Sequence, residues 1–389
     1  MQHSFLNPLV SEIPSSGIRK FFDFVLEAGP DVISLGVGEP DFPTPWHIRY
    51  QTIRALEEGV TSYTSNKGMT ELRAAISKDI SERYNVRYDY HEEVLVTNGV
   101  SEGMDLAFRA CICPGDTVLI PDPSYVMYEP LIRLAQGDVS VYNPLDLSDL
   151  ITAMKSAKIV VLNYPGNPIG NTFSLEELEK IARAAERENC LIFSDEIYGL
   201  LSYKQEHYSF PAIEGMKERT IYFNGLSKSH SMTGYRIGWV CGPSEIIQAI
   251  TRIHQYSALC ASSFGQRASI EALENGESEA EKMKQEYDQR RLFCIKKLKE
   301  LGLVFYPPSG AFYIFVNIQS TGLSSSDFCH QLLENEKLAV VPGNAFGPNG
   351  EGYIRMTYAE NREALKEAFI RLERFLVSIG AASSQSLKR

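Results

Sequence analysis

Short apolar runs alternate with longer amphipathic segments through the middle of the chain. This alternation is typical of strand–helix–strand units, so it predicts an α/β fold with a largely parallel sheet. Ser174 and Glu177 have the spacing of a capping box and predict a helix that runs to about Glu188. Ser244, after Pro243, is expected to cap the next helix in the same way. The predicted strands are Glu93–Thr97, Thr117–Pro121, Lys158–Asn163, Leu191–Ser194, Thr220–Asn224 and Ile237–Cys241.

The pattern changes from about residue 278 onward. A long charged helix is predicted over Ser278–Leu301, and short strands and a closing helix follow it. This change predicts a second, smaller layer of different construction. The polar end, 381–389, is expected to fray. The short strands are predicted around Ala311–Asn317, Ala339–Val341 and Gly352–Tyr358.

The composition is that of an ordinary globular protein. The 389 residues are 44% hydrophobic and 22% charged, and such a chain is long enough to form more than one core. The formal net charge of −11 argues against a nucleic-acid partner, because phosphate binding usually shows as a basic patch. No secretory signal and no membrane-spanning apolar run is expected. Together these features predict a cytoplasmic protein.

The cysteines and histidines do not suggest a metal site. There are seven of each, and they lack the spacing of metal ligands. Cys111 and Cys113 are too close together for a zinc ribbon and are expected in the core of a helix. No metal is therefore predicted.

The residues that follow the strands are the first candidates for a site, because ligands bind at the carboxyl ends of open parallel sheets. After the first strand, Gly99 permits a tight turn, and the free amides of Val100 and Ser101 open a helix. Such a helix start attracts phosphate, although Asn-Gly is also common in a simple turn. The segment Gly36–Pro40 lacks the third glycine of a dinucleotide-binding fingerprint.

Lys228 follows Ser227 and precedes Arg236 by eight residues, after the predicted strand Thr220–Asn224. An amine becomes a useful nucleophile when burial or a neighbouring cation lowers its pKa, and Ser227 and Arg236 could hold a phosphate dianion. The segment could therefore form a Schiff base beside a bound phosphate. The alternative is three solvated polar side chains, as most lysines and arginines are.

Two further strand ends carry side chains suited to holding a ring. Asn167 is flanked by prolines at 165 and 168, which fix the backbone and would present the amide rigidly; a surface loop is the alternative. Asp195 and Tyr198 follow the strand Leu191–Ser194, and their spacing puts a carboxylate and a phenol on one side of a turn. Asp195 could instead cap a helix.

Together, these strand ends offer an aldehyde-capturing amine, a carboxylate, a phenol with an amide, and a phosphate cradle, and pyridoxal 5′-phosphate needs all four. On these motifs the chain resembles the class I and II aminotransferases, a family of fold type I pyridoxal-phosphate enzymes. The resemblance extends from Ile33–Phe42 to Gly352–Tyr358. The segments Ser16–Lys20 and His254–Ala261 are similar to a subgroup with bacterial N-acetyl-LL-diaminopimelate aminotransferase and archaeal aromatic or aspartate aminotransferases.

The resemblance implies an architecture and an assembly. It implies a large domain over 46–280, with a mostly parallel central sheet flanked by helices, and a smaller α+β domain built from 1–45 and 281–389. Tyr63 matches the tyrosine that reaches the phosphate of the neighbouring subunit. The chain is therefore expected to form a homodimer with shared active sites.

The resemblance also implies roles toward the cofactor. Lys228 would form the internal aldimine with pyridoxal 5′-phosphate and later shuttle a proton between the substrate Cα and the cofactor C4′. Asp195 would pair with the pyridine nitrogen and keep it protonated. Tyr198 and Asn167 would bond the ring 3′-oxygen, and Tyr125 would stack on the ring. The phosphate would be held by Ser227, Arg236, Ser101 and the amide of Val100.

Toward the substrate, the resemblance implies that Arg355 clamps the α-carboxylate and that the backbone of Gly38 lies against it, beside Tyr125 and Asn167. The implied reaction moves an amino group between an L-amino acid and a 2-oxo acid such as 2-oxoglutarate, in two half-reactions. The donor could be aspartate, aromatic or N-acetyl-diaminopimelate-like. No residue matches the second arginine of aspartate-specialised relatives, so the side chain stays open.

Two alternatives to amino transfer remain. A C–S β-lyase on the same fold would release ammonia and pyruvate from cystathionine without accumulating the pyridoxamine form. A non-catalytic ligand-sensing domain of a transcription regulator would carry a basic winged-helix segment ahead of the fold. The resemblance begins near residue 16, which is expected to leave no room for such a segment.

Overall fold

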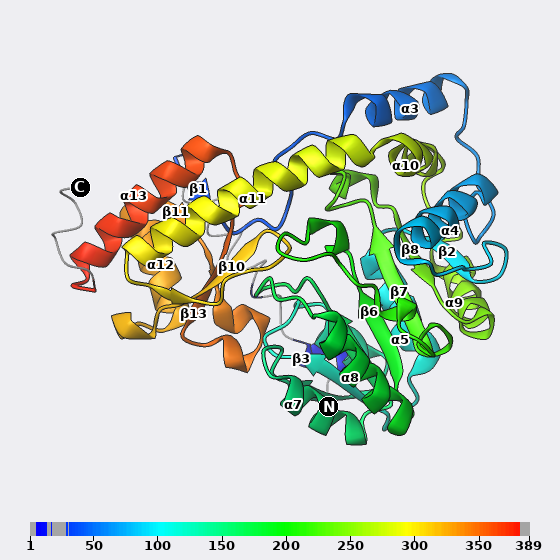
Figure 1. The fold of residues 1–389 in the computed structure, drawn as a ribbon, viewed down its shortest axis with the longest axis horizontal. Coiled ribbons are helices and arrows are strands. Elements are labelled where there is room, and N and C mark those ends of the chain that lie inside the picture. Colours follow the sequence, from blue (N-terminus) through cyan, green and yellow to red (C-terminus); the bar gives the residue numbers. More distant parts are fainter. Residues whose placement is uncertain (1–4, 14–16, 18–28, 30, 382–389) are drawn as a thin grey trace.

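The computed structural model of the chain describes residues 5–13, 17, 29 and 31–381, and its main feature is a seven-stranded sheet (Figure 1). The strand order is β2-β8-β7-β6-β5-β3-β4, and β8 runs against the direction of all the others. The predicted α/β fold with a mostly parallel sheet is confirmed. The strands are β2 (Val94–Thr97), β3 (Thr117–Pro121), β4 (Asp138–Tyr142), β5 (Ile159–Asn163), β6 (Leu191–Asp195), β7 (Thr220–Gly225) and β8 (Gly238–Cys241).

Helices cover both faces of this sheet, which explains why its central strands are continuous apolar runs. Along β5, Ile159 and Val161 pack into one core, while Val160 and Leu162 pack into another on the opposite face. The helices of this layer are α3 (Trp46–Glu57), α4 (Thr70–Tyr84), α5 (Val100–Cys111), α6 (Tyr128–Leu134), α7 (Leu147–Ala153), α8 (Leu175–Arg187), α9 (Ser244–Ser257) and α10 (Ser263–Asn275).

The local helix signals were correct at one position and wrong at two. The capping box of Ser174 and Glu177 opens α8 as predicted. Ser244 does not cap α9: it is the first helical residue, and Pro243 occupies the N-cap position without a side-chain bond. Cys111 ends α5, but Cys113 lies outside the helix and is exposed, so its expected core position is wrong. The proline at 114 disfavours helical backbone at Cys113.

One strand of the large sheet was not predicted from the sequence. Strand β4 lies at the edge of the sheet, and only Tyr142 in it is fully buried. The other four residues of β4 are exposed or half-buried, so this strand does not need a continuous apolar run. The run Asp138-Val-Ser-Val-Tyr142 therefore lacks the signal that marked the central strands.

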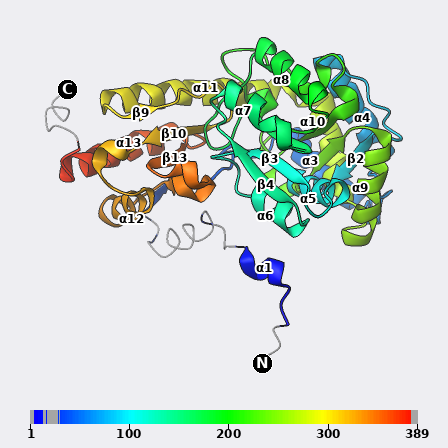
Figure 2. The same ribbon diagram turned by 90° about the horizontal axis from the view of Figure 1, so that it is seen from below.

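The C-terminal part forms the smaller layer, as predicted (Figure 2). The long charged helix is α11 (Glu277–Glu300), which extends from the large layer to the small one (Figure 1). Strand β1 pairs in parallel with β11, which supports the assignment of the N-terminal segment to this layer; the domain boundaries themselves stay predictions. The other elements are β1 (Ile33–Ser34), β9 (Val304–Phe305), β10 (Tyr313–Asn317), α12 (Ser325–Glu336), β11 (Leu338–Ala339), β12 (Val341–Pro342), β13 (Tyr353–Thr357) and α13 (Arg362–Ser378).

A few sequence features fall at the limits of this description. Apart from Gly17, the segment 16–20 lies outside the described residues, and so does the tail from 382 onward. A short helix, α1 (Pro8–Glu12), lies near α6. Across the described part of the chain, no helix is long and apolar enough to cross a membrane.

Candidate active site

Lys228 lies beyond the end of β7 and is half-buried rather than fully solvated. Its Nζ donates a hydrogen bond to the carbonyl oxygen of Gly38 at 2.8 Å, which brings together two predicted site residues 190 positions apart. Burial lowers the pKa of Lys228 to about 8; Glu39 opposes this shift, and Arg355 and Arg236 add to it. A lysine with this pKa is partly neutral near neutral pH, so it is a competent nucleophile.

Asp195 ends β6 and is buried. The hydroxyl of Tyr128 donates to its Oδ2 at 2.5 Å, and the amide of Ile197 donates to its Oδ1 at 3.3 Å. Burial raises the pKa of Asp195 to about 6, and these two hydrogen bonds oppose the rise. Only the short 3₁₀ turn Gly199–Leu201 follows, so the alternative of a helix cap is wrong. Tyr128 was missed, although its three-residue spacing from Tyr125 was a usable signal.

The hydroxyl of Tyr198 lies 2.7 Å from the hydroxyl of Tyr313 in β10, and the two rings meet edge to face. Gly38 packs against the same hydroxyl: a Cβ at position 38 would stand 2.5 Å from it. A side chain at this position would therefore displace Tyr313. The small layer thus supplies one wall of the candidate site, and the sequence pattern had not given Tyr313 a role.

Arg355 projects from β13 into the contact between the two layers, and its side chain is buried. Its Nη1 donates to Oδ1 of Asn167 at 3.1 Å, and its Nη2 donates to the carbonyl oxygen of Gly36 at 2.5 Å. The guanidinium lies over the rings of Tyr313 and Phe346, at 4.5 and 4.8 Å from their centroids. Burial lowers the pKa of Arg355.

No carboxylate pairs with Arg355 among the residues that the structure describes, and its Nε has no hydrogen-bond partner there. A buried charge without a counter-ion is costly, so such a side chain is found where an anion can bind. The planar fork of a guanidinium suits a carboxylate. Asn167, held by Arg355 and by a 2.9 Å bond from its own amide to Asn163, faces the same place.

The start of α5 forms the second anion-attracting part of the site. Gly99 has a φ of 81° and precedes Val100, the first residue of α5. A Cβ on Gly99 would stand 2.6 Å from Nη2 of Arg236, so the glycine admits the guanidinium beside the helix start. Arg236 is exposed and donates to the carbonyl oxygen of Thr233 at 3.0 Å. A helix N-terminus beside an arginine suits a phosphate.

Tyr125 joins these groups into one cluster. Burial raises the pKa of Tyr125, Asp195 raises it further, and a hydrogen bond from the side chain of Ser101, together with Arg355 and Arg236, opposes the rise. The same two arginines thus lower the pKa values of both Tyr125 and Lys228. Ser227, immediately before Lys228, is buried.

A supporting contact behind α5 was not anticipated. The carboxylate of Glu102 accepts hydrogen bonds from the backbone amide and the side chain of Asn98, at 2.6 and 3.1 Å. Its other oxygen lies 3.3 Å from Nδ1 of buried His254. This arrangement fixes the turn that leads into Gly99.

Tyr63 is the one predicted site residue that stands apart. It lies between α3 and α4, its side chain is 82% exposed, and in the described part of the chain it makes no hydrogen bond. Large apolar side chains are also exposed on α3 and from the last turn of α9 to the first turn of α10. They are Trp46, Tyr50, Ile53, Leu56, Tyr256, Leu259 and Phe264.

The comparisons with known proteins agree with one another on the family. The family model for aminotransferase class I and II matches residues 30–372. A Bacillus subtilis relative named "Probable N-acetyl-LL-diaminopimelate aminotransferase" is 42% identical over 384 residues, which are 97% of each chain. An aspartate aminotransferase of Pyrococcus horikoshii is 42% identical over 385 residues, 96% of this chain and 97% of that relative.

A solved structure adds a likeness in fold. The aromatic aminotransferase from Pyrococcus horikoshii OT3 matches with a TM-score of 0.88 and 38% identity, over 92% of this chain and 100% of that chain. Proteins named for three different substrates are thus similar to this chain to a comparable degree.

Proposed function

The chain belongs to the class I and II aminotransferases, and we propose that it transfers an amino group between an L-amino acid and a 2-oxo acid with pyridoxal 5′-phosphate bound at Lys228. One observation carries the proposal. Half-buried Lys228, with its pKa lowered, shares a cluster with buried Asp195 and with Arg355, a buried guanidinium that has no carboxylate partner among the described residues. The cluster combines a nucleophile with binding groups for two anions.

The donor set fits the cofactor. Arg236, the amide of Val100, Ser101 and Ser227 would hold its phosphate, because Gly99 leaves the guanidinium room beside the start of α5. Asp195 would pair with the ring nitrogen, and Tyr125 would lie against the ring. The bound cofactor supplies an electron sink for the substrate carbanion. Tyr198 and Asn167 would form hydrogen bonds with the 3′-oxygen of the ring.

The chain's own residues would perform the remaining work. Lys228 would take the proton from the substrate Cα with its Nζ, because its pKa of about 8 leaves a useful fraction of neutral amine. Arg355 would hold the α-carboxylate as a two-pronged donor, and the backbone of Gly38 would line the space beside it. Tyr128 would keep Asp195 oriented toward the ring.

A homodimer is part of the proposal. Exposed Tyr63 and the apolar face of α3 form a surface of the kind that subunit interfaces use. Tyr63 would then reach the phosphate of the neighbouring subunit, as it does in the family that the sequence resembles. The proposal also keeps a cytoplasmic location.

The substrate is proposed only as a class. The relatives are named for aspartate, aromatic and N-acetyl-LL-diaminopimelate substrates, so we propose one of these donors with 2-oxoglutarate as acceptor.

An absorbance titration of the purified protein tests the function. The visible band of the bound cofactor should be lost on addition of a matching amino donor and restored by 2-oxoglutarate. Aspartate, phenylalanine, glutamate, alanine and cystathionine are compared in turn. Pyruvate and ammonia from cystathionine, with the band unchanged, would instead establish the β-lyase. A protein that binds the cofactor but turns over no donor would match the ligand-sensing alternative.

A further inference from the structure

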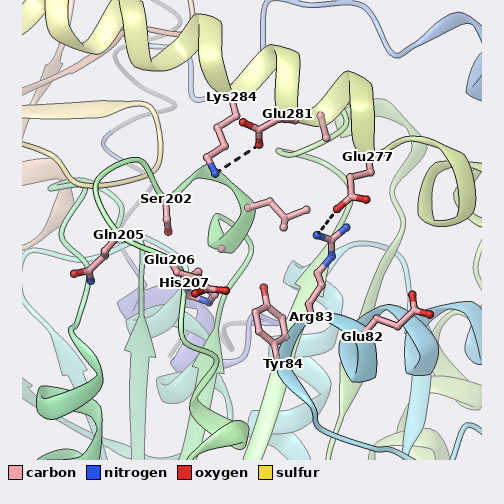
Figure 3. Close-up of a pocket in the computed structure, with 13 residues that line it drawn as sticks. Glu82, Arg83, Tyr84, Ser202, Gln205, Glu206, His207, Glu277, Glu281 and Lys284 are labelled. Atoms are coloured by element: carbon pink, nitrogen blue, oxygen red, sulfur yellow. Dashed lines mark hydrogen bonds and ion pairs between the residues drawn. The ribbon is translucent and has the colours of Figure 1, made fainter.

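A second pocket lies outside the cluster around Lys228 (Figure 3). It has a volume of about 400 Å³, is open on one side to solvent, and is bordered by the end of α4, the segment 199–207 and the first turns of α11. Gly199, Leu200 and Ser202 line it, and they follow Tyr198 directly in the chain. One short segment therefore borders both the candidate active site and this pocket.

Three polar groups in the lining are without partners in the described part of the chain. The side chain of Ser202 is 4% exposed, its hydroxyl makes no hydrogen bond, and it points into the pocket in Figure 3. The hydroxyl of Tyr84 points into the same space and has no hydrogen bond, and Glu206 has no ion pair. A buried hydroxyl without a partner costs free energy. A ligand that donates hydrogen bonds would satisfy the two hydroxyls, and a cationic ligand would also pair with the exposed carboxylate of Glu206.

The charge of the lining predicts that the ligand is positively charged. The lining holds four carboxylates and two permanent cations, Arg83 and Lys284, which leaves a net charge of −2 with His207 neutral. Both cations are already engaged: Arg83 lies 3.0 Å from Glu277, and Lys284 lies 3.7 Å from Glu281. The other two carboxylates of the lining are Glu206 and Glu82. Glu206 has no ion pair, and Glu82 lies 3.9 Å from Lys78, which is outside the lining.

The floor of the pocket favours an organic cation. The rings of Tyr84 and His207 meet edge to face, 5.8 Å apart, and Nε2 of His207 is 2.7 Å from buried Glu196. An aromatic floor attracts a cation and accepts a hydrocarbon chain. No group of three or more His, Cys, Asp or Glu side chains that could hold a metal ion occurs within 5–13, 17, 29 and 31–381.

We propose that this pocket binds a small aliphatic diamine, whose two positive charges match the net charge of −2 of the lining. One ammonium group would pair with Glu206, which has no ion pair, and the other would approach Glu82, whose exposed carboxylate lies 3.9 Å from Lys78. The hydrocarbon chain would lie on the rings of Tyr84 and His207, and one ammonium group would donate to the hydroxyl of Ser202. The bound diamine would touch the turn after Tyr198 and the start of α11. The proposal is independent of the function proposed above.

Isothermal titration calorimetry of the full chain tests this site, with 1,4-diaminobutane as the probe and 1-aminobutane as the single-charge comparison. We expect the diamine to bind more tightly than the monoamine. Glu206→Gln should weaken diamine binding about tenfold, because a charge-assisted contact is lost. The matched control is Glu214→Gln, which removes the same charge from an exposed residue of the same connecting segment outside the pocket. The affinity of Glu214→Gln for the diamine should equal that of the unsubstituted protein.

An amine could also enter the candidate active site, so Lys228→Ala is titrated in parallel. Diamine binding that survives in Lys228→Ala and weakens in Glu206→Gln supports the pocket. Binding lost in Lys228→Ala and retained in Glu206→Gln would overturn the proposal. So would equal weakening by Glu206→Gln and Glu214→Gln, which would indicate general attraction to an acidic protein, and so would the absence of heat at millimolar diamine.

Discussion

Arg355 and Arg236 belong to the same candidate site but are held in contrasting ways. Arg355 is 2% exposed, lies between two aromatic rings and donates to Asn167 and Gly36. Arg236 is exposed and has one hydrogen bond, to the carbonyl oxygen of Thr233. Neither has a carboxylate partner among the described residues.

The difference teaches how one site can bind two anions for different purposes. A guanidinium held in a dry place is costly to bury but is fixed in orientation, so it suits a substrate carboxylate that must be bound in one geometry. An exposed guanidinium beside a helix start costs little and attracts a phosphate through its charge. Both guanidinium groups lower the pKa of Lys228.

The largest expected effect is at Lys228, whose pKa both arginines lower. Lys228→Ala should lower the rate of amino transfer by at least about 10³-fold, since both the nucleophile and the proton carrier are lost. Steady-state kinetics measures the loss, and circular dichroism checks that the fold is kept. Lys158→Ala, in an exposed ion pair with Asp116, is the control. Full activity in Lys228→Ala would refute the assignment.

Asp195 is the buried carboxylate of the same cluster, and Asp195→Asn should slow the chemical step by about 10²- to 10⁴-fold. Asparagine can still accept the bond from Tyr128 but cannot stabilise a protonated ring nitrogen. Single-turnover absorbance isolates this step from binding. An unchanged rate would mean that another group protonates the ring.

Arg355 is next, and two variants separate its charge from its geometry. Arg355→Lys should raise KM about 10- to 100-fold for every amino donor alike, because a point charge cannot reproduce the two-pronged contact. Arg355→Met should abolish donor binding without lowering the free energy of unfolding, because it removes an unpaired buried charge. Kinetics and denaturant unfolding measure the two effects. A loss confined to one class of donor would place Arg355 in the side-chain pocket instead.

Arg236→Met should act on the cofactor and leave the substrate unaffected. The affinity for pyridoxal 5′-phosphate should fall about 10- to 100-fold, which corresponds to the loss of a hydrogen bond to a charged group. At saturating cofactor, KM for the donors should not change. Spectral titration with the cofactor provides the first value and kinetics the second. A raised KM at saturation would contradict the division of roles.

The smallest effect concerns the pKa of Lys228 in the cofactor-free protein. Removing a nearby cation makes the protonated amine less unfavourable, so both Arg355→Met and Arg236→Met should raise this pKa above about 8. Arg355→Met should raise it more, because water and salt screen the exposed guanidinium of Arg236. The pH dependence of acylation of Lys228, followed by mass spectrometry, measures both shifts. Equal shifts would mean that burial does not distinguish the two arginines.

The sequence by itself determined the large layer and half of the candidate site. Continuous apolar runs identified the central strands, because both faces of that sheet are covered, and they failed for β4 at the exposed edge. Parallel strands bring their carboxyl ends to one edge, so the residues directly after the strands can be grouped from the order of the chain alone. Lys228, Asp195 and the turn at Gly99 were found in this way.

Only the tertiary structure decided which groups touch and which stay unpaired. Tyr198 meets Tyr313 over 115 positions, Arg355 meets Asn167 over 188, and Lys228 meets Gly38 over 190. Periodicity reports on neighbours within a few residues, whereas these contacts form when the small layer packs against the sheet. The burial of Arg355, and with it the unpaired charge that suits a carboxylate, is a property of that packing and not of the local sequence.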